Sequence, residues 1–213
     1  MLTIETARSW YTDSDPVHGL DHVLRVYRLA EKIAQAEGAD LEIVRAAALL
    51  HDAEGSATFG GDEGRLEHHQ ASAAFARQIL EAEGWAEDRI AAVEHCIRSH
   101  RFRNESEQPQ TLEARVLYDS DKLDVIGAIG VARTIAFDVV VGQPIYAEPS
   151  EHFTRTGVKE PGEVHSSYHE YLFKLKKIKD RLHTPTAKAL AVDRHRFLEE
   201  FFTRLPAEIR GDI

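Results

Sequence analysis

The stretch DLEIVRAAALLHD, residues 40–52, decides the fold. Asp40 is a suitable N-cap, and the apolar residues after it mark a helix that is buried on nearly all sides and therefore central: Ile43, Ala46, Ala47, Leu49 and Leu50. We expect this helix to run straight into His51-Asp52 and to end near Gly55. A carboxylate there is costly unless it is paired or bound to a metal ion. A lone His-Asp pair is common by chance, however, and the plain alternative is a helix C-cap beside a core histidine.

Helical periodicity continues on both sides of this stretch. Upstream, apolar residues recur at helical spacing after Asp21, which we interpret as an N-cap, and Gly38 closes that segment. Downstream, the pattern predicts helices over residues 66–83, 87 to about 102, 111–121, 126–140, 166–182 and 184 to about 204. Residues 143–161 have no clear period and indicate an ordered flap near the site. With no two-residue alternation anywhere, the sequence predicts an all-α fold, an irregular helical bundle.

The composition indicates a folded chain without a membrane segment. It has 213 residues, of which 43% are hydrophobic, enough for a continuous core. The longest apolar candidate, residues 125–141, is interrupted by glycines and by Arg133 and Asp138. The N-terminus has neither a basic nor an apolar region of an export signal, and the single Cys96 can form no internal disulfide. We therefore expect a cytoplasmic protein that does not bind membranes.

Charge and histidine content narrow the class of ligand. The net charge of −10 argues against a duplex nucleic-acid partner, because phosphate contacts need a dense Lys/Arg surface. A small phosphorylated substrate remains compatible, since a metal ion and a few local cations offset its charge inside a cleft. The 12 histidines, several of them set among Asp and Glu, favour a metal site.

Two further stretches favour a metal site at His51-Asp52 over a simple helix C-cap. HGLDHVLRV, residues 18–26, places His22 in the first turn of an amphipathic helix, and DSDKLD, residues 119–124, sets acidic residues in an otherwise apolar helix. Together with His51-Asp52 this pattern resembles the HD-domain superfamily of metal-dependent phosphohydrolases. The resemblance implies four protein ligands: His22, His51, Asp52 and Asp121. Asp121 is preferred to Asp119 because the family motif runs Asp-Arg/Lys-Leu, as residues 121–123 do.

The resemblance covers nearly the whole chain. Residues 119–133 (DSDKLDVIGAIGVAR) and the tail from His169 to Phe202 are similar to a bacterial subgroup whose better-known members act on nucleoside triphosphates. It implies a single HD-type domain over residues 1–213. Its ligand-bearing helical core would span about residues 18–140, with the flap 143–161 and the C-terminal helices 166–204 packed on it.

The residue types fit metal-assisted hydrolysis independently. Two imidazoles and two carboxylates suit one divalent ion of Mn, Mg, Fe, Co or Ni, with Zn as a further candidate. Four ligands leave positions for water and a phosphate oxygen on a six-coordinate ion. The expected reaction is an in-line displacement by water that the metal activates, because the ion lowers the pKa of bound water and neutralises charge on the phosphorus centre.

Further histidines extend the predicted site. His68 and His100 occupy positions resembling those of two-metal members of the superfamily, so they would bind a second ion or contact substrate phosphate. For His68 the alternative is a solvated helix face shared with His69. His100 continues an apolar stripe and favours a functional role, whereas His95 lies on another face of the same predicted helix and is expected to be structural.

Other polar groups complete the candidates. His18 precedes the His22 helix, and the family pattern of a histidine at this spacing supports a phosphate contact. Lys122 would neutralise phosphate, and Arg98 belongs with Arg101 and Arg103 to an entry patch for a polyanion, or simply to an exposed helix end. Glu54 would be a general base, although it lies two residues after Asp52 where relatives have three. The candidate catalytic residues are thus Asp52, His100 and Glu54.

The function expected from these residues and the resemblance is hydrolysis of a small phosphorylated metabolite. The subgroup resemblance implies foremost a nucleoside triphosphate, cleaved to monophosphate and pyrophosphate. A phosphomonoesterase acting on nucleoside monophosphates is the nearest alternative. A di-iron oxygenase of HD type would need both His68 and His100 as ligands. A non-catalytic nucleotide-binding sensor is the third alternative, and the presence of all four ligands weighs against it.

Overall fold

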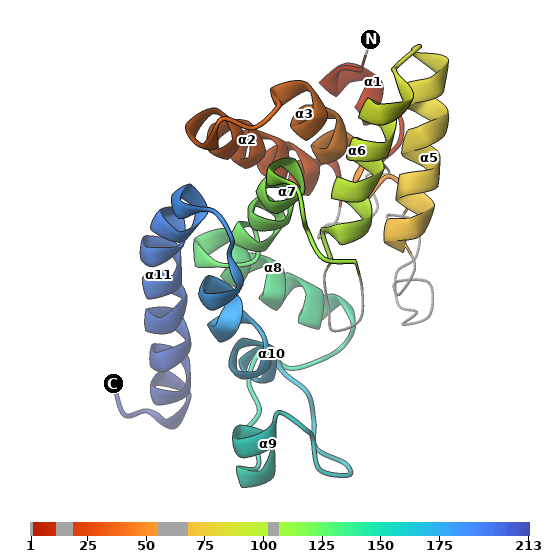
Figure 1. Cartoon of the computed structure of the whole chain (residues 1–213). Helices are drawn as coiled ribbons and strands as arrows, with labels where there is room; N and C mark the ends of the chain where they lie inside the picture. Colours follow the sequence, from red (N-terminus) through yellow and green to blue (C-terminus); the bar gives the residue numbers. More distant parts are fainter. Residues whose placement is uncertain (1, 12–18, 55–67, 102–106) are drawn as a thin grey trace. The chain divides into compact units, whose positions relative to one another are not determined.

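A computed structural model describes residues 2–11, 19–54, 68–101 and 107–213 (Figure 1). Regular structure in these ranges is entirely helical, which confirms the predicted all-α class. None of the helices within them is long and apolar enough to cross a bilayer. The chain forms two compact units, Met1–Asp121 with Leu182–Ala187, and Lys122–Arg181 with Lys188–Ile213. The single domain over residues 1–213 stays a prediction.

Helix α3, Leu41–Leu50, is the central helix of the first unit, as the sequence predicts. It packs against α1 (Ile4–Arg8), α2 (Leu20–Glu37), α5 (His68–Ala82) and α6 (Glu87–Ser99), and Figure 1 shows it between α2 and α6. Seven of its ten residues are buried, so hydrophobic burial fixes its position. The Asp40 side chain caps it by accepting hydrogen bonds from the N–H groups of Glu42 and Ile43.

The other helix boundaries of this unit refine the predictions. α2 begins at Leu20 with Gly19 as its N-cap, so the assignment of Asp21 as the cap is wrong. Asp21 instead lies in the first turn, where its charge is favourable to the helix dipole. α6 ends at Ser99 instead of near residue 102. α7, Leu112–Leu123, begins after Thr111, whose hydroxyl accepts from the Ala114 N–H at 3.2 Å, as expected of a cap.

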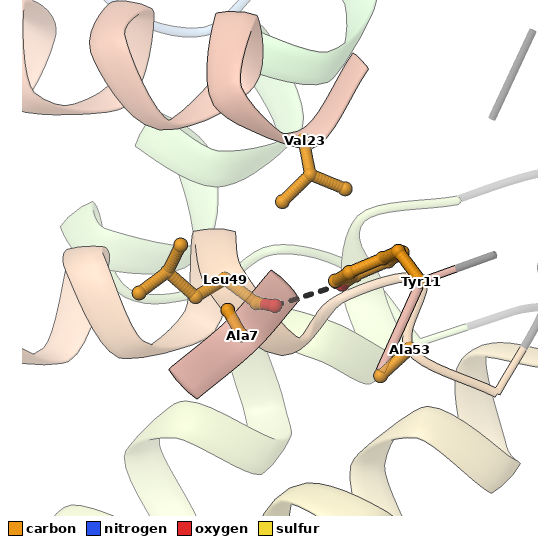
Figure 2. Close-up of a cluster of buried hydrophobic side chains, with 5 residues drawn as sticks. All are labelled: Ala7, Tyr11, Val23, Leu49 and Ala53. Atoms are coloured by element: carbon orange, nitrogen blue, oxygen red, sulfur yellow. Dashed lines mark hydrogen bonds between the residues drawn. The ribbon is translucent and has the colours of Figure 1, made fainter. Parts of the chain in front are cut away.

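A hydrophobic cluster lies behind the end of α3 (Figure 2). Ala7 and Tyr11 come from the N-terminal segment and pack with Val23, Leu49 and Ala53. The Tyr11 hydroxyl donates to the backbone carbonyl of Leu49 at 2.7 Å. The N-terminal segment thus packs against residues on both sides of His51-Asp52 in the chain, Leu49 and Ala53.

The second unit contains α8 (Gly127–Val140), α9 (Glu151–Thr156), α10 (Ser167–Phe173), a 3₁₀ helix (Leu175–Arg181) and most of α11 (Pro185–Arg210). The segment 143–161 is therefore not entirely loop, because Ser150 caps α9 within it. α11 continues past the predicted residue 204, with Pro206 inside it.

The predicted continuous helix over 166–182 is also wrong, because it divides at Lys174. Beyond that residue the Lys177 N–H bonds to the Lys174 carbonyl at 3.0 Å, the three-residue spacing of a 3₁₀ helix. In such a helix residues three apart share one face, so Leu175 and Ile178 are both buried.

Candidate metal centre

The four predicted ligands come together in the first unit. His22 extends from the first turn of α2, His51 and Asp52 follow α3, and Asp121 lies in α7. His22 Nε2 lies 3.4 Å from His51 Nε2, 3.7 Å from Asp52 Oδ2 and 3.3 Å from Asp121 Oδ1. The possible metal-ligand atoms of His22, His51 and Asp52 all lie within 4.8 Å of one another. Asp121 joins this group by its contact with His22.

Two of the imidazoles have their tautomer fixed by backbone carbonyls. His51 Nδ1 lies 2.8 Å from the Ala48 carbonyl, and His100 Nδ1 lies 2.6 Å from the Ile97 carbonyl. Because a carbonyl oxygen only accepts, Nδ1 carries the proton in each ring and Nε2 keeps a lone pair. Burial lowers the pKa of His51, and it lowers that of His100 to about 4. Both rings are therefore neutral near pH 7 and suited to bind a cation.

Asp52 stands between the imidazoles as a carboxylate. Burial alone would raise its pKa, but His51, His100 and His68 bring that pKa well below its ordinary value. Its Oδ2 lies 3.6 Å from His51 Nε2. Its Oδ1 is buried, and within the described residues it has no hydrogen bond of proper geometry. A buried carboxylate oxygen without an aligned hydrogen bond, beside imidazole nitrogens that keep a lone pair, is the chemistry of a cation site, so these residues fit a divalent ion.

A second group of possible metal-ligand atoms surrounds Oδ1, the other oxygen of Asp52. His68 Nε2 lies 3.2 Å and His100 Nε2 3.5 Å from Oδ1, and donor atoms of the three residues lie within 4.8 Å of one another. The His68 side chain is only 11% exposed. The alternative of a solvated helix face is therefore wrong for His68, and the prediction that His68 and His100 extend the site agrees with their position.

The structure gives the surroundings of three further candidates. Glu54 is exposed in the turn after Asp52, and its backbone N–H donates to Ser72 Oγ at 3.3 Å. Arg98 forms an ion pair with Glu107 at 2.7 Å. Lys122 is half-buried and belongs to the second unit, and His18 lies outside the described residues. The catalytic role of Glu54 and the substrate contacts of His18, Lys122 and Arg98 stay predictions.

Two neighbouring residues have structural partners. His95 binds Glu107 through Nδ1, and its Nε2 accepts from the Gln110 N–H at 3.1 Å, in agreement with the structural role expected for it. Asp119 is fully buried, and it accepts from the His183 N–H at 2.9 Å and from the Thr184 N–H and hydroxyl at 2.7 Å. Because these bonds use both oxygens of Asp119, they support Asp121 as the ligand.

Sequence reasoning did not predict the contact of Arg101 with His68, whose Nδ1 lies 2.8 Å from the guanidinium. The position of Arg101 with Arg98 and Arg103 indicated only an entry patch for a polyanion or an exposed helix end. Tyr11, which supports the α3 end, was likewise missed because no short motif joins residues 38 positions apart.

Comparison with known proteins identifies the class. The HD domain family matches residues 19–126, the range that contains all four predicted ligands. YpgQ of Bacillus subtilis is 31% identical over 214 residues, which cover 97% of this chain and 94% of YpgQ. The chain belongs to the HD domain family, and it is a metal-dependent phosphohydrolase.

Solved structures agree in fold over the whole chain. The structure of YpgQ in complex with ADP has a TM-score of 0.74 at 30% identity and covers 98% of this chain and 99% of its own. A protein of Lactobacillus plantarum has a TM-score of 0.76 at 32% identity, covering 99% and 100%. An HD-superfamily hydrolase of Bacillus thuringiensis has a TM-score of 0.69 at 27% identity, covering 97% and 96%.

Proposed function

We propose that the substrate is a nucleotide, foremost a nucleoside triphosphate that water cleaves to a nucleoside monophosphate and pyrophosphate. The observation that carries this proposal is the ADP complex of YpgQ, a relative similar over 98% of this chain. A ligand with adjacent phosphates suits a centre where neutral imidazoles and carboxylates converge, because a divalent ion bound there would offset the phosphate charge.

We propose that His22, His51, Asp52 and Asp121 hold one divalent ion of Mn, Mg, Fe, Co or Ni, with Zn as a further candidate. When bound, the ion supplies Lewis-acid activation of water and charge neutralisation at phosphorus. His51 offers Nε2 because the Ala48 carbonyl holds the proton on Nδ1. His100 offers a second Nε2 lone pair, which suits it to accept a proton from the attacking water.

The test is a screen of protein stripped with chelator and reloaded separately with each metal. Nucleoside tri-, di- and monophosphates and simple phosphate monoesters would be substrates, and phosphate and pyrophosphate would be followed separately. Pyrophosphate release in equal amount to the monophosphate is the expected result. Phosphate release from monophosphates would instead identify a phosphomonoesterase. No turnover by protein that binds metal would reject hydrolysis of these substrates.

A further inference from the structure

The Nδ1 atom of His68 contacts an arginine, whereas the Nδ1 atoms of His51 and His100 contact backbone carbonyls. His68 Nδ1 lies 2.8 Å from a terminal nitrogen of Arg101. A guanidinium carries donors and no acceptor, so His68 Nδ1 must accept. In the neutral ring the proton is then on Nε2, the atom that lies 3.2 Å from Asp52 Oδ1.

The imidazoles around Asp52 are therefore of two kinds. His51 and His100 carry the proton on Nδ1 and present an Nε2 lone pair, whereas His68 presents an Nε2–H. A metal ligand must offer a lone pair, so His68 cannot bind an ion through Nε2 while Arg101 occupies its Nδ1. By distance alone, Asp52, His68 and His100 could bind a second ion. With the proton on Nε2, however, His68 is not available as a ligand, so only two of the three residues could bind it.

We propose that Arg101 is a positioning residue that fixes His68 as a hydrogen-bond donor to a substrate phosphate oxygen, so that the centre holds one metal ion and not two. The phosphate contact rests on the proposed function, but the tautomer and the metal stoichiometry do not. A donor at this position suits a polyanionic substrate, since hydrogen bonds to charged oxygens are the stronger class.

The first test measures the tautomers directly by ¹⁵N NMR of the histidine rings, in metal-free protein and with Mg²⁺. We expect His68 to be protonated at Nε2, and His51 and His100 at Nδ1. In Arg101→Ala the His68 ring should shift toward the Nδ1–H form, and Arg101→Lys should restore the original form because lysine also only donates. Protonation of wild-type His68 at Nδ1 would overturn the proposal without any variant.

The second test counts Mn²⁺ in protein equilibrated with excess metal and then desalted. A stoichiometry near one is expected for the wild type, and two bound ions would overturn the proposal. With nucleoside triphosphate, Arg101→Ala should raise KM roughly tenfold with little change in kcat, as expected for one weakened hydrogen bond to a charged group. An unchanged KM in Arg101→Ala would contradict the phosphate contact.

Arg89→Ala is the matched control. Arg89 lies in α6 and is ion-paired with Asp40 and Glu42, so its loss should leave KM, tautomers and stoichiometry unchanged. Failure of the proposed function is distinguishable, because a protein that cleaves no nucleotide would still report its tautomers and its stoichiometry.

Discussion

Asp52 in the first unit and Glu163 in the second are both carboxylates with a lowered pKa, yet opposite chemistry surrounds them. Burial would raise the pKa of Glu163, but hydrogen bonds bring it to about 2. The Ser150 N–H and hydroxyl donate at 2.8 and 2.9 Å, the Glu160 N–H donates at 2.7 Å, and His169 Nε2 lies at 3.2 Å. Asp52 faces the Nε2 lone pairs of His51 and His100 instead. The Nε2–H of His68 lies 3.2 Å from Asp52 Oδ1, but that oxygen has no aligned hydrogen bond among the described residues.

The difference shows that a lowered pKa does not by itself mark a functional carboxylate. Glu163 is satisfied by protein donors and holds the segment around α9 in place, so it needs no further partner. Asp52 is buried against the Nε2 lone pairs of His51 and His100, so a bound cation would offset charge that the protein donors around it do not fully satisfy. The surrounding donors and acceptors, not the pKa, separate structure from function here.

Matched amide substitutions at Asp52 and Glu163 should give the largest difference between the two carboxylates. Asp52→Asn removes the negative charge between the imidazoles, so we expect Mn²⁺ affinity and hydrolysis to fall on the order of 10³-fold. Glu163→Gln should leave Mn²⁺ affinity unchanged, since its bonds are all to protein donors. Isothermal titration calorimetry and initial rates measure the two effects.

Thermal unfolding gives an independent check on that pair. Metal at about 100 times its Kd should stabilise the wild type and Glu163→Gln by about 2.7 kcal/mol, and it should not stabilise Asp52→Asn. Equal stabilisation of Asp52→Asn would show that the ion binds elsewhere.

Asp119 and Asp121 of α7 allow the same comparison, between a carboxylate bonded to protein donors and a proposed metal ligand, within one helix. Asp121→Asn should weaken metal binding and activity by about 10²-fold or more while helical content is retained. Asp119→Asn should keep metal binding but lower stability by about 1–3 kcal/mol, because one amide cannot accept all the bonds from His183 and Thr184. Circular dichroism, urea unfolding and Mn²⁺ titration separate the outcomes. Full activity in Asp121→Asn would mean that the wrong aspartate was chosen.

The sequence predicts the start of α3 well because its cause is local. The predicted end near Gly55 is wrong, because α3 ends at Leu50 with His51 as its C-cap, and residues 51–54 form a turn. The cap at Asp40 and the apolar run after it act within a few residues, and the structure has the helix there. The gathering of His22 and Asp121 around His51-Asp52 depends on contacts over tens of residues. It followed from the family resemblance, not from periodicity.

Other features escaped prediction for physical reasons. The role of His68 depends on which nitrogen holds a proton, and a neighbour 33 residues away decides this. The break at Lys174 escaped because the spacing of Leu175 and Ile178 fits both 3.6 and 3.0 residues per turn. The cap at Gly19 was assigned to Asp21 since Asp is the stronger capping residue by preference alone.

Tyr11 belongs to the hydrophobic cluster and bonds to Leu49, close in the chain to His51-Asp52. Its substitution should have a smaller effect than those of the aspartates. The Ala53 N–H bonds to the Leu50 carbonyl, and the Tyr11 hydroxyl donates to that of Leu49 (Figure 2). Burial, and then the charge of Asp52, raise the pKa of Tyr11 well above its ordinary value, so it stays protonated and able to donate. Tyr11→Phe leaves a buried carbonyl without this bond and should cost about 1–3 kcal/mol in urea unfolding.

Tyr146→Phe is the control for Tyr11, because its hydroxyl bonds to the exposed Glu148 in the second unit. Its stability should change by less than about 0.5 kcal/mol. If Tyr11→Phe is equally mild, the hydroxyl of Tyr11 does not hold the end of α3.

The smallest effect concerns pH and Glu163. Its folded pKa of about 2 lies below the ordinary 4.5, so its contribution to stability is present above pH 4.5 and is lost as the pH falls toward 2. The amide resonances of Ser150 and Glu160, whose N–H groups donate to Glu163, should shift over this window. An acid titration followed by ¹H–¹⁵N NMR measures the shift.

Glu163→Gln decides whether the shift belongs to this carboxylate. Both oxygens of Glu163 accept, so an amide must turn its NH₂ toward one of the donors, and the bonds weaken at every pH. The variant should therefore lack the transition between pH 4.5 and 2 at Ser150 and Glu160. A transition that persists would come from another group, and the satisfied carboxylate would then not be what orders this segment.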